Sequence, residues 1–398
     1  MAKANGKPNG GAAPFLISGG GIGGLIAAYA LAQQGFPVRL FEQSAEFREV
    51  GAGIQLGPNI FRVLAKVGLK DAVLADVHRP PAQEMRDALT GKLITRIPLG
   101  NEFSDRFGQP YAVTHRADIH GTFLKACEGS NLITLETSRR VDAYKDHGDR
   151  VTVTLNDGEV VSGCALIGCD GMWSKIREHI VGDGAPRVSG HIAYRGVLKR
   201  EEVPEDLWRP DVVLWAGPRT HFVHYPLRRG ELYNLVAVFH SDRYEEGWNA
   251  EGAKDVMWQH FKMQVPQVTR MLERIETWRM WVLCDREPVK DWSKGRVTLL
   301  GDAAHPMLQY LAQGACMATE DAIILADKVA AQPNDLPAAF KAYEQERYLR
   351  TARVQIMARV YGDFYHARGV TAELRDLALS PRTPQQAYDG IAWLYGGP

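Results

Sequence analysis

Residues 15–24 read Phe-Leu-Ile-Ser-Gly-Gly-Gly-Ile-Gly-Gly, and they are the most informative segment of the sequence about its fold. The apolar residues at its start indicate a short strand, the glycines indicate a tight turn, and the apolar run that follows predicts a helix reaching about Gln34. Gly35 stands where a helix C-cap glycine belongs, and a second strand over residues 38–41 ends at Glu42. The sequence therefore predicts a β-α-β unit with a G-x-G-x-x-G turn after its first strand.

The residues of this unit have the spacing of a dinucleotide site. Gly21 lets backbone N–H groups approach a pyrophosphate, and the N-terminus of the helix favours the anion. Gly24 lets the helix pack close to the strand, and the carboxylate of Glu42 can accept hydrogen bonds from a ribose diol. The predicted cofactor-binding residues of the unit are Gly19, Gly21, Ile22, Gly23, Gly24 and Glu42.

Two later segments have a carboxylate at the end of an apolar strand. Residues 165–177 contain a D-G turn at Asp170, and residues 296–306 contain a G-D turn at Asp302. Open α/β sheets bind ligands at such strand ends. Two ordinary turns between core strands are the alternative interpretation. The three motifs in this order resemble the class A flavoprotein aromatic hydroxylases, from about Phe15 to about Val360.

The resemblance implies a fold and a cofactor. The expected fold is α/β, with a Rossmann-like FAD-binding domain interleaved with a smaller, mainly antiparallel-sheet substrate domain, followed by C-terminal helices. In that family the first glycine motif binds the ADP part of FAD. By resemblance, Asp170 touches both FAD and NAD(P)H, and Asp302 holds the ribityl chain of FAD.

Further cofactor contacts rest on the same resemblance. Arg116 matches an arginine that reaches the FAD phosphates, and a guanidinium suits a pyrophosphate; pairing with Asp118 at the surface is the alternative. Arg48, in the loop after the second strand, either reaches phosphate or is solvated. Gly51 and Gly53 in the same loop suggest close approach of the backbone to the flavin.

The segment after the G-D turn departs from the usual pattern of this class. It has Ala312 and Cys316 where most members have the first glycine and the asparagine of G-Q-G-x-N. Gly314 and the adjacent Ala315 remain as predicted cofactor contacts. Pro306 is expected to lie against the flavin ring.

Three residues are candidates for the chemistry. Strand periodicity over residues 219–227 places His221, Val223 and Tyr225 on one face. By itself this pattern is also that of a polar pair at a sheet edge. The run resembles the H-F-x-x-Y-P-L segment of 3-hydroxybenzoate 6-hydroxylases, in which the His activates the substrate phenol and the Tyr binds the substrate. Gln309, in a similar L-Q-Y-L-A run, is expected to partner the His, or else to cap a backbone group.

The implied activity is that of a flavoprotein monooxygenase. NAD(P)H reduces FAD, O2 forms a flavin C4a-hydroperoxide, and 3-hydroxybenzoate is hydroxylated para to its phenol to give gentisate. A salicylate 1-hydroxylase or a hydroxypyridine-carboxylate hydroxylase is the alternative within the class. A flavin reductase or flavin-binding protein without oxygen insertion is the alternative outside it. The residues do not decide between NADH and NADPH, and NADH is favoured only by the resemblance.

Composition limits the partners. The chain has 398 residues and zero net charge, so nothing favours nucleic acid or an acidic membrane surface. Five cysteines without a C-x-x-C pair favour a reducing compartment, and we expect a cytoplasmic protein. No apolar run approaches the roughly 20 residues that span a bilayer. The twelve histidines show no zinc-site spacing. Related enzymes are commonly dimers, so we expect a homodimer.

The expected domain organisation is discontinuous, with a flexible leader that lacks the apolar segment of a signal peptide. Residues 337–366 have a helical pattern, whereas the tail from Ser380 has no clear periodicity and is interpreted as a docking arm or a loose end. The expected segments are the leader, 1–13; the FAD-binding domain, 14–78, 110–185 and 285–335; the substrate domain, 79–109 and 186–284; and the C-terminal helical region and tail, 336–398.

Overall fold

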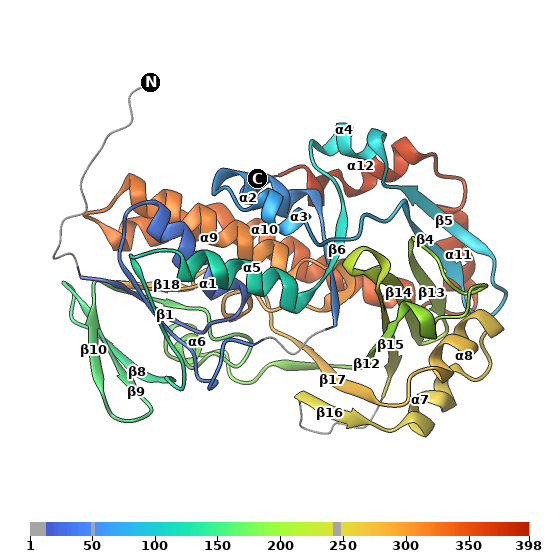
Figure 1. Ribbon diagram of the computed structural model, residues 1–398, viewed down its shortest axis with the longest axis horizontal. Helices are drawn as coiled ribbons and strands as arrows, with labels where there is room; N and C mark the ends of the chain where they lie inside the picture. Colours follow the sequence, from blue (N-terminus) through green and yellow to red (C-terminus); the bar gives the residue numbers. More distant parts are fainter. Residues whose placement is uncertain (1–12, 49–51, 242–247, 398) are drawn as a thin grey trace.

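A computed structural model describes residues 13–48, 52–241 and 248–397 (Figure 1). The predicted β-α-β unit forms the centre of one sheet, in which β1 pairs in parallel with both β2 and β11. Gly35 has a φ of +88°, as a glycine after a helix end commonly does. The six strands lie in the order β18 (Ser293–Lys294), β19 (Val297–Leu299), β11 (Ala165–Gly168), β1 (Phe15–Ser18), β2 (Val38–Phe41) and β7 (Ile133–Glu136).

Helix α1 (Ile22–Gln33) is apolar almost throughout because it is covered on both sides. It packs against α5 (Arg116–Glu128) and α9 (Gly314–Ala331), and most of its residues are buried. Burial on every side explains why the segment lacks the polar face of a surface helix. The packing fixes the N-terminus of α1 directly beyond the end of β1.

A second sheet lies at the other end of the molecule (Figure 1). Its strands are antiparallel except for the pair β13–β4. One face is covered by α7 (Lys254–Phe261) and α8 (Pro266–Glu273), which bury apolar side chains against it. The strand order is β16 (Trp248–Gly252), β17 (Trp278–Asp285), β12 (Arg187–Lys199), β15 (Leu232–His240), β14 (Thr220–Leu227), β13 (Val212–Gly217), β4 (Ala82–Asp87) and β5 (Leu93–Pro98).

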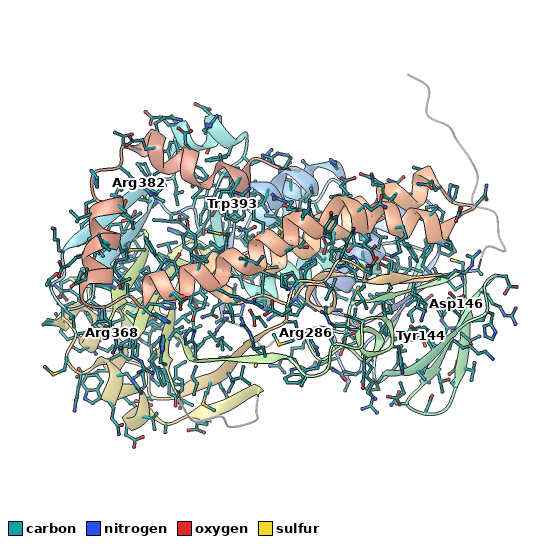
Figure 2. All side chains as sticks on the ribbon, turned by 180° about the vertical axis from the view of Figure 1, so that it is seen from behind. Tyr144, Asp146, Arg286, Arg368, Arg382 and Trp393 are labelled. Atoms are coloured by element: carbon teal, nitrogen blue, oxygen red, sulfur yellow. The ribbon has the colours of Figure 1, made fainter. Side chains whose placement is uncertain are left out.

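The chain passes between the two sheets several times, so the predicted interleaved α/β fold is confirmed. Helix α10 (Leu336–Tyr365) runs along much of the long axis of the molecule and contacts β18 and β19 (Figures 1 and 2). Among the residues that the structure describes, no helix is long and apolar enough to cross a membrane. The boundaries of the four predicted segments stay a prediction.

Smaller elements complete the fold. The remaining strands are β3 (Gly53–Leu56) paired with β6 (Ala112–His115), and the three-stranded sheet β8 (Val141–Asp146), β9 (Val151–Leu155) and β10 (Val160–Gly163). The remaining helices are α2 (Pro58–Lys66), α3 (Lys70–Leu74), α4 (Asn101–Phe107), α6 (Lys175–Ile180), α11 (Val370–Leu379) and α12 (Pro384–Tyr395), with 3₁₀ turns η1 (Arg200–Glu202), η2 (Arg228–Gly230), η3 (Gly301–Ala303) and η4 (Gln309–Leu311).

The interpretation of the tail as aperiodic was wrong. Residues Pro384–Tyr395 form α12, which begins at a capping box between Thr383 and Gln386. The S/T-x-x-E/Q pattern that predicts such a start is present in the sequence, with a proline at the first helical position. Tyr388 and Leu394 bury the inner face of the helix, so the segment is not a loose end, and a docking role in a dimer stays a prediction.

Candidate cofactor and substrate site

A cavity of about 900 Å³ lies between the two sheets. It extends from the glycine turn after β1 to strands β12, β14 and β15 of the second sheet, and its volume falls in the range of small-molecule and cofactor sites. Most of the predicted site residues line it: Gly19, Gly21, Ile22, Gly23, Glu42, Arg116, Asp170, His221, Tyr225, Asp302, Gln309, Gly314 and Ala315.

The glycine turn has no room for side chains. Gly19 has a φ of +105°, and an added Cβ would lie 2.3 Å from the carbonyl oxygen of Cys169. At Gly24 an added Cβ would lie 1.9 Å from the carbonyl oxygen of Gly19. Both contacts are with backbone, which cannot move aside. The helix therefore approaches the strand as closely as a dinucleotide turn requires, and its free N–H groups open onto the cavity.

Glu42 is held in position by the backbone on both sides. One carboxylate oxygen accepts a hydrogen bond from the N–H of Gly20 at 2.7 Å, and the other accepts one from the N–H of Ser44 at 2.8 Å. Each oxygen keeps a second acceptor position. The carboxylate therefore fits the ribose diol of an FAD molecule whose pyrophosphate lies at the glycine turn.

Asp170 and Asp302 occupy the strand ends predicted for them. Asp170 accepts hydrogen bonds from the hydroxyl of Ser174 at 2.6 Å and the N–H of Lys175 at 3.1 Å, which fixes it at the start of α6. Asp302 faces the cavity, and desolvation there raises its pKa, while the charge of Arg116 opposes the rise. A carboxylate that faces a cavity suits a hydroxyl-rich ligand such as the ribityl chain.

A buried cluster of charged side chains is hydrogen-bonded to the G-D turn and holds it in place. The carboxylate of Asp321 accepts hydrogen bonds from the N–H of Gly301 at 3.1 Å, from Nε2 of His305 at 2.6 Å and from Nε of Arg347 at 2.6 Å. Burial opposes ionisation, yet these cationic and hydrogen-bonding partners lower the pKa of Asp321 to about 2. Neighbouring Glu320 is also buried and binds Arg347 at 2.6 Å. The cluster thus fixes the loop that presents Asp302.

Three predicted cofactor residues lie outside the cavity lining. Gly24 acts through packing inside α1. Arg48 is exposed and pairs with Glu46 at 3.2 Å. Pro306 is buried and its carbonyl accepts a hydrogen bond from Gln355, while the next residue, Met307, lines the cavity. Direct contact of Arg48 and of Pro306 with FAD stays a prediction.

For the two glycines after Arg48, close approach to the flavin stays a prediction. Gly51 lies outside the described residues. Gly53 lines the cavity, but its close contacts are with protein: an added Cβ would lie 2.7 Å from the ring of Tyr225 and 2.9 Å from Asn234. The N–H of Gly53 also donates to the side chain of Asn234 at 2.7 Å. This glycine therefore joins β3 to β14 and β15 of the second sheet at the cavity wall.

Strand β14 has the predicted alternation. His221, Val223 and Tyr225 line the cavity. On the opposite face, His224 is hydrogen-bonded to Nε1 of Trp215 at 3.0 Å and to the hydroxyl of Tyr233 at 2.8 Å. Burial lowers the pKa of His221 to about 3, so the imidazole is neutral at pH 7. A neutral imidazole in the cavity can accept a proton.

Sequence reasoning missed Arg195, the cation of the substrate sheet. Its guanidinium lines the cavity, lies 5.3 Å from the ring centre of Trp281, and donates a hydrogen bond to the side-chain oxygen of Gln309. Its Nε is buried without a hydrogen bond. In the part of the chain that the structure describes, no carboxylate forms an ion pair with Arg195, and desolvation lowers its pKa to about 10.

The strand register explains how Arg195 reaches the catalytic candidates. Arg195 lies opposite Val236 on β15, and Val236 lies opposite Val223 on β14. Arg195 is therefore level with a point midway between His221 and Tyr225, whose backbones are about 13 Å apart along the strand. An arginine among the mainly apolar residues of a predicted strand was the sequence signal for a functional cation. The sequence does not reveal how β12 pairs with β15 and β14, so it could not place Arg195 beside His221 and Tyr225.

The C-terminal helix closes part of the cavity. Trp393, labelled in Figure 2, together with Leu394 and Tyr395, lines it from α12. Arg350 on α10 donates to the carbonyl oxygens of Trp393 at 3.2 Å and Leu394 at 3.0 Å. The C-terminal end of α12 is thereby held over the site by hydrogen bonds from the guanidinium of Arg350 to backbone carbonyls.

Comparison with known proteins defines the class. Residues 12–358 match the FAD binding domain family, so the chain belongs to that family. Together with the fit of the glycine turn, Glu42 and Asp302 to FAD, this confirms the expected cofactor. The chain is 44% identical to the 3-hydroxybenzoate 6-hydroxylase of Polaromonas naphthalenivorans (strain CJ2) over 383 residues, which are 96% of each chain. It is also 44% identical to that of Klebsiella oxytoca over 381 residues, again 96% of each chain. The expected assignment to the flavoprotein monooxygenases is therefore confirmed.

Solved structures agree with this assignment. Klebsiella pneumoniae HpxO in complex with FAD and uric acid superimposes with a TM-score of 0.85 at 26% identity, with 97% of each chain covered. A salicylate hydroxylase in complex with substrate superimposes with a TM-score of 0.80 at 24% identity, with 97% of this chain and 98% of that chain covered, and supports the fold alone.

Proposed function

We propose that this protein hydroxylates 3-hydroxybenzoate para to its hydroxyl group, consuming NAD(P)H and O2 and releasing gentisate. The similarity to curated 3-hydroxybenzoate 6-hydroxylases over nearly the whole chain supports the proposal. The single structural observation behind it is one cavity with a dinucleotide turn at one end and His221, Gln309 and Arg195 at the other. These groups match the phenol and carboxylate of a hydroxybenzoate.

The protein positions the substrate and moves a proton, while bound FAD supplies the redox chemistry. His221 accepts the proton of the substrate hydroxyl, because a ring approaching phenolate is rich enough in electrons to be hydroxylated. The side-chain oxygen of Gln309 is engaged by Arg195, so its NH₂ group is the end that donates to the phenolate oxygen. Tyr225 binds the substrate from the same strand as His221.

Arg195 anchors the carboxylate of the substrate. A buried guanidinium is unfavourable unless a negative charge compensates it. The ligand supplies that charge, and Nε of Arg195 has a donor to spare for a carboxylate oxygen. With the phenol at His221 and the carboxylate at Arg195, the orientation of the ring is fixed at two points, which selects the carbon that is hydroxylated.

Salicylate and hydroxypyridine carboxylates are the alternative substrates. They carry a hydroxyl and a carboxylate as well, in a different geometry. A flavin reductase without oxygen insertion is the alternative of another class, and such a protein needs neither the phenol acceptor nor the carboxylate anchor.

The test measures NADH and NADPH consumed against hydroxylated product formed, with 3-hydroxybenzoate, 4-hydroxybenzoate and salicylate supplied separately. We expect close to one product per NADH with 3-hydroxybenzoate and little turnover of the others. Turnover of salicylate to catechol would show that the protein is instead a salicylate 1-hydroxylase. Reduced cofactor consumed with no product from any acid would assign a reductase.

We further propose a cytoplasmic enzyme that works as a homodimer. All five cysteines are free in the structure, in line with a reducing compartment, and the dimer rests on the class resemblance alone. Size-exclusion chromatography with light scattering tests the second statement, and a monomer at micromolar concentration would contradict it.

A further inference from the structure

Four histidines from distant parts of the chain meet behind the substrate end of the cavity. His191 lies on β12, His221 on β14 and His240 at the end of β15, and His366 follows α10. His191, His221 and His366 are buried, whereas His240 is partly exposed. Of the four, His221 lines the cavity. The group therefore extends from the cavity toward the surface.

Three of these imidazoles form a continuous hydrogen-bonded chain. Nδ1 of His221 lies 2.7 Å from Nε2 of His366, and Nδ1 of His366 lies 2.9 Å from Nε2 of His240. Backbone hydrogen bonds join the main chains that carry the last two rings, since the N–H of Arg219 donates to the carbonyl of His366 at 3.0 Å and the N–H of His240 donates to the carbonyl of Arg219 at 3.1 Å. With Nδ1 engaged, Nε2 is the nitrogen of His221 that is left for a ligand.

We propose that His221, His366 and His240 form a proton relay that carries the proton of the substrate hydroxyl from the cavity to solvent. The inference rests on the proposed function, because it assumes a phenol at His221. His221 and His366 each bond through Nδ1, on the side away from the cavity, to Nε2 of the next ring, so a proton that enters at Nε2 of His221 can be passed from ring to ring toward His240. Neither Arg195 nor Tyr225 offers such a path.

The proton balance of the relay closes. At the start each ring carries its proton on Nδ1 and accepts through Nε2. The substrate O–H bond breaks as its proton binds Nε2 of His221. Nδ1 of His221 then passes its proton to Nε2 of His366, and Nδ1 of His366 passes its proton to Nε2 of His240. His240 releases a proton from Nδ1 to water. One proton enters, one leaves, and a phenolate remains; the reverse path restores the starting tautomers when the product hydroxyl is formed.

The surroundings keep the relay neutral, as transfer through alternating donors and acceptors requires. Burial lowers the pKa of His240 to about 4 and lowers that of His366 further, and the other imidazoles of the cluster add to the effect. Around the exit, Arg219 and Arg368 disfavour a charged His240 and Asp363 favours it. A proton that reaches His240 therefore leaves readily to solvent at neutral pH.

A metal site is the competing interpretation of the same cluster. Ligand atoms of His191, His240 and His366 lie within 4.8 Å of one another. Both nitrogens of His366 are hydrogen-bonded to other rings, however, and Nδ1 of His191 is hydrogen-bonded to the hydroxyl of Tyr310 at 2.5 Å. A metal would have to break the bond between His366 and His240, so the relay accounts for more of the geometry.

The test follows ionisation of bound 3-hydroxybenzoate by its phenolate absorbance in a stopped-flow instrument, using the FAD-loaded enzyme without NADH. His366→Leu interrupts the chain but leaves His221 in the cavity, and His240→Leu removes the exit at a partly exposed position where folding is less at risk. We expect both to slow ionisation by at least about tenfold with substrate Kd changed less than threefold, and added imidazole to restore part of the rate in His240→Leu. His260→Leu, at an exposed histidine outside the chain, is the matched control and should ionise substrate like wild type.

Wild-type rates of ionisation in both variants would overturn the relay. So would loss of ionisation in wild type on treatment with EDTA and its return with Zn²⁺ alone, which would assign a metal site. The proposed function fails separately: its failure is the absence of hydroxylated product with the wild-type enzyme, which is measured before any variant is made.

Discussion

Gly24 and Gly121 are both glycines inside helices, in α1 and α5, but an added methyl group would meet different surroundings. At Gly24 it would lie 1.9 Å from a backbone oxygen, whereas at Gly121 nothing lies within 4 Å. Alanine in a helix interior is favoured over glycine by about 1 kcal/mol. We therefore expect Gly121→Ala to raise the melting temperature slightly.

At Gly24 the clash with the backbone makes the Gly→Ala change destabilising, whereas at Gly121 it is stabilising. Overpacking costs about 1–3 kcal/mol, and the displaced turn no longer presents its N–H groups to the pyrophosphate. Gly24→Ala should melt several degrees lower than wild type and bind FAD at least about tenfold more weakly. Thermal unfolding and flavin-fluorescence titration measure both effects. Equal FAD affinity in the two alanine variants would show that the turn does not hold the cofactor.

Arg195 is predicted to determine the affinity for the carboxylate. A hydrogen bond to a charged group contributes about 1.5–3 kcal/mol, so Arg195→Met should raise the Kd of 3-hydroxybenzoate by about 10- to 150-fold. Arg195→Lys should recover part of this loss, because it keeps the charge but not the planar donor geometry.

The neutral analogue 3-hydroxybenzamide is the control for Arg195. Its Kd should change less than threefold in both variants, since it brings no charge to the guanidinium. Equal losses for acid and amide would mean that the arginine only supports the shape of the pocket. If the variants lose affinity for FAD and keep their affinity for the substrate, Arg195 binds the flavin and not the substrate carboxylate.

At the scale of elements, the ion cluster between α9, α10 and the G-D turn is predicted to stabilise the FAD site. Breaking a buried ion pair from one side costs about 3–5 kcal/mol. Asp321→Asn should therefore lower the melting temperature markedly and weaken FAD binding, because the charge is lost and an NH₂ group replaces one of the two oxygens that accept from Gly301, His305 and Arg347. Asp291→Asn, which removes an exposed partner of Lys341, should cost less than about 1 kcal/mol.

The same carboxylate predicts a pH dependence. The pKa of Asp321 is lowered to about 2 in the folded protein. Its stabilising contribution is therefore fully present above the unfolded pKa of about 4 and is lost as pH falls from about 4 toward 2. Unfolding measured across this range should show a smaller decline in Asp321→Asn than in wild type. An identical decline would exclude Asp321 as the source.

Helix α12 is predicted to exclude water from the cavity. Deleting residues 383–398 removes Trp393, Leu394 and Tyr395 from the lining and opens the site to solvent. Water exclusion protects reactive intermediates in flavin sites. We expect the truncated enzyme to consume NADH with a larger share of hydrogen peroxide per product; Asp389→Ala, on the exposed side of α12, is the control. Unchanged coupling after truncation would contradict the lid role.

Local sequence signals predicted the elements better than they predicted the site. The glycine turn, the ends of β1, β2 and α1, and the alternation on β14 follow from periodicity and glycine spacing, which act over a few residues. Arg195 and the histidine chain depend on which strands are neighbours, which no local pattern reveals. The helix at Pro384–Tyr395 was predictable from its capping box but was overlooked.

At the scale of the whole molecule, the cavity belongs to neither sheet alone. The six-stranded sheet presents the glycine turn, Glu42 and Asp302, and the eight-stranded sheet presents His221 and Arg195 across the same space. The chain crosses between the sheets several times, so the elements that carry the cofactor groups and the substrate groups are tied together by repeated chain connections. This rigid placement is what a regioselective hydroxylation requires.

Product identity from 3-hydroxybenzoate tests the central claim most directly. A phenolate directs charge to both its ortho and para carbons, so selection depends on how His221 and Arg195 orient the ring. Chromatography of the products formed with NADH and O2 should show gentisate, with oxygen para to the original hydroxyl, as the main product. Protocatechuate as the main product would contradict the orientation set by the two anchors, and the absence of any dihydroxybenzoate would contradict the proposed function itself.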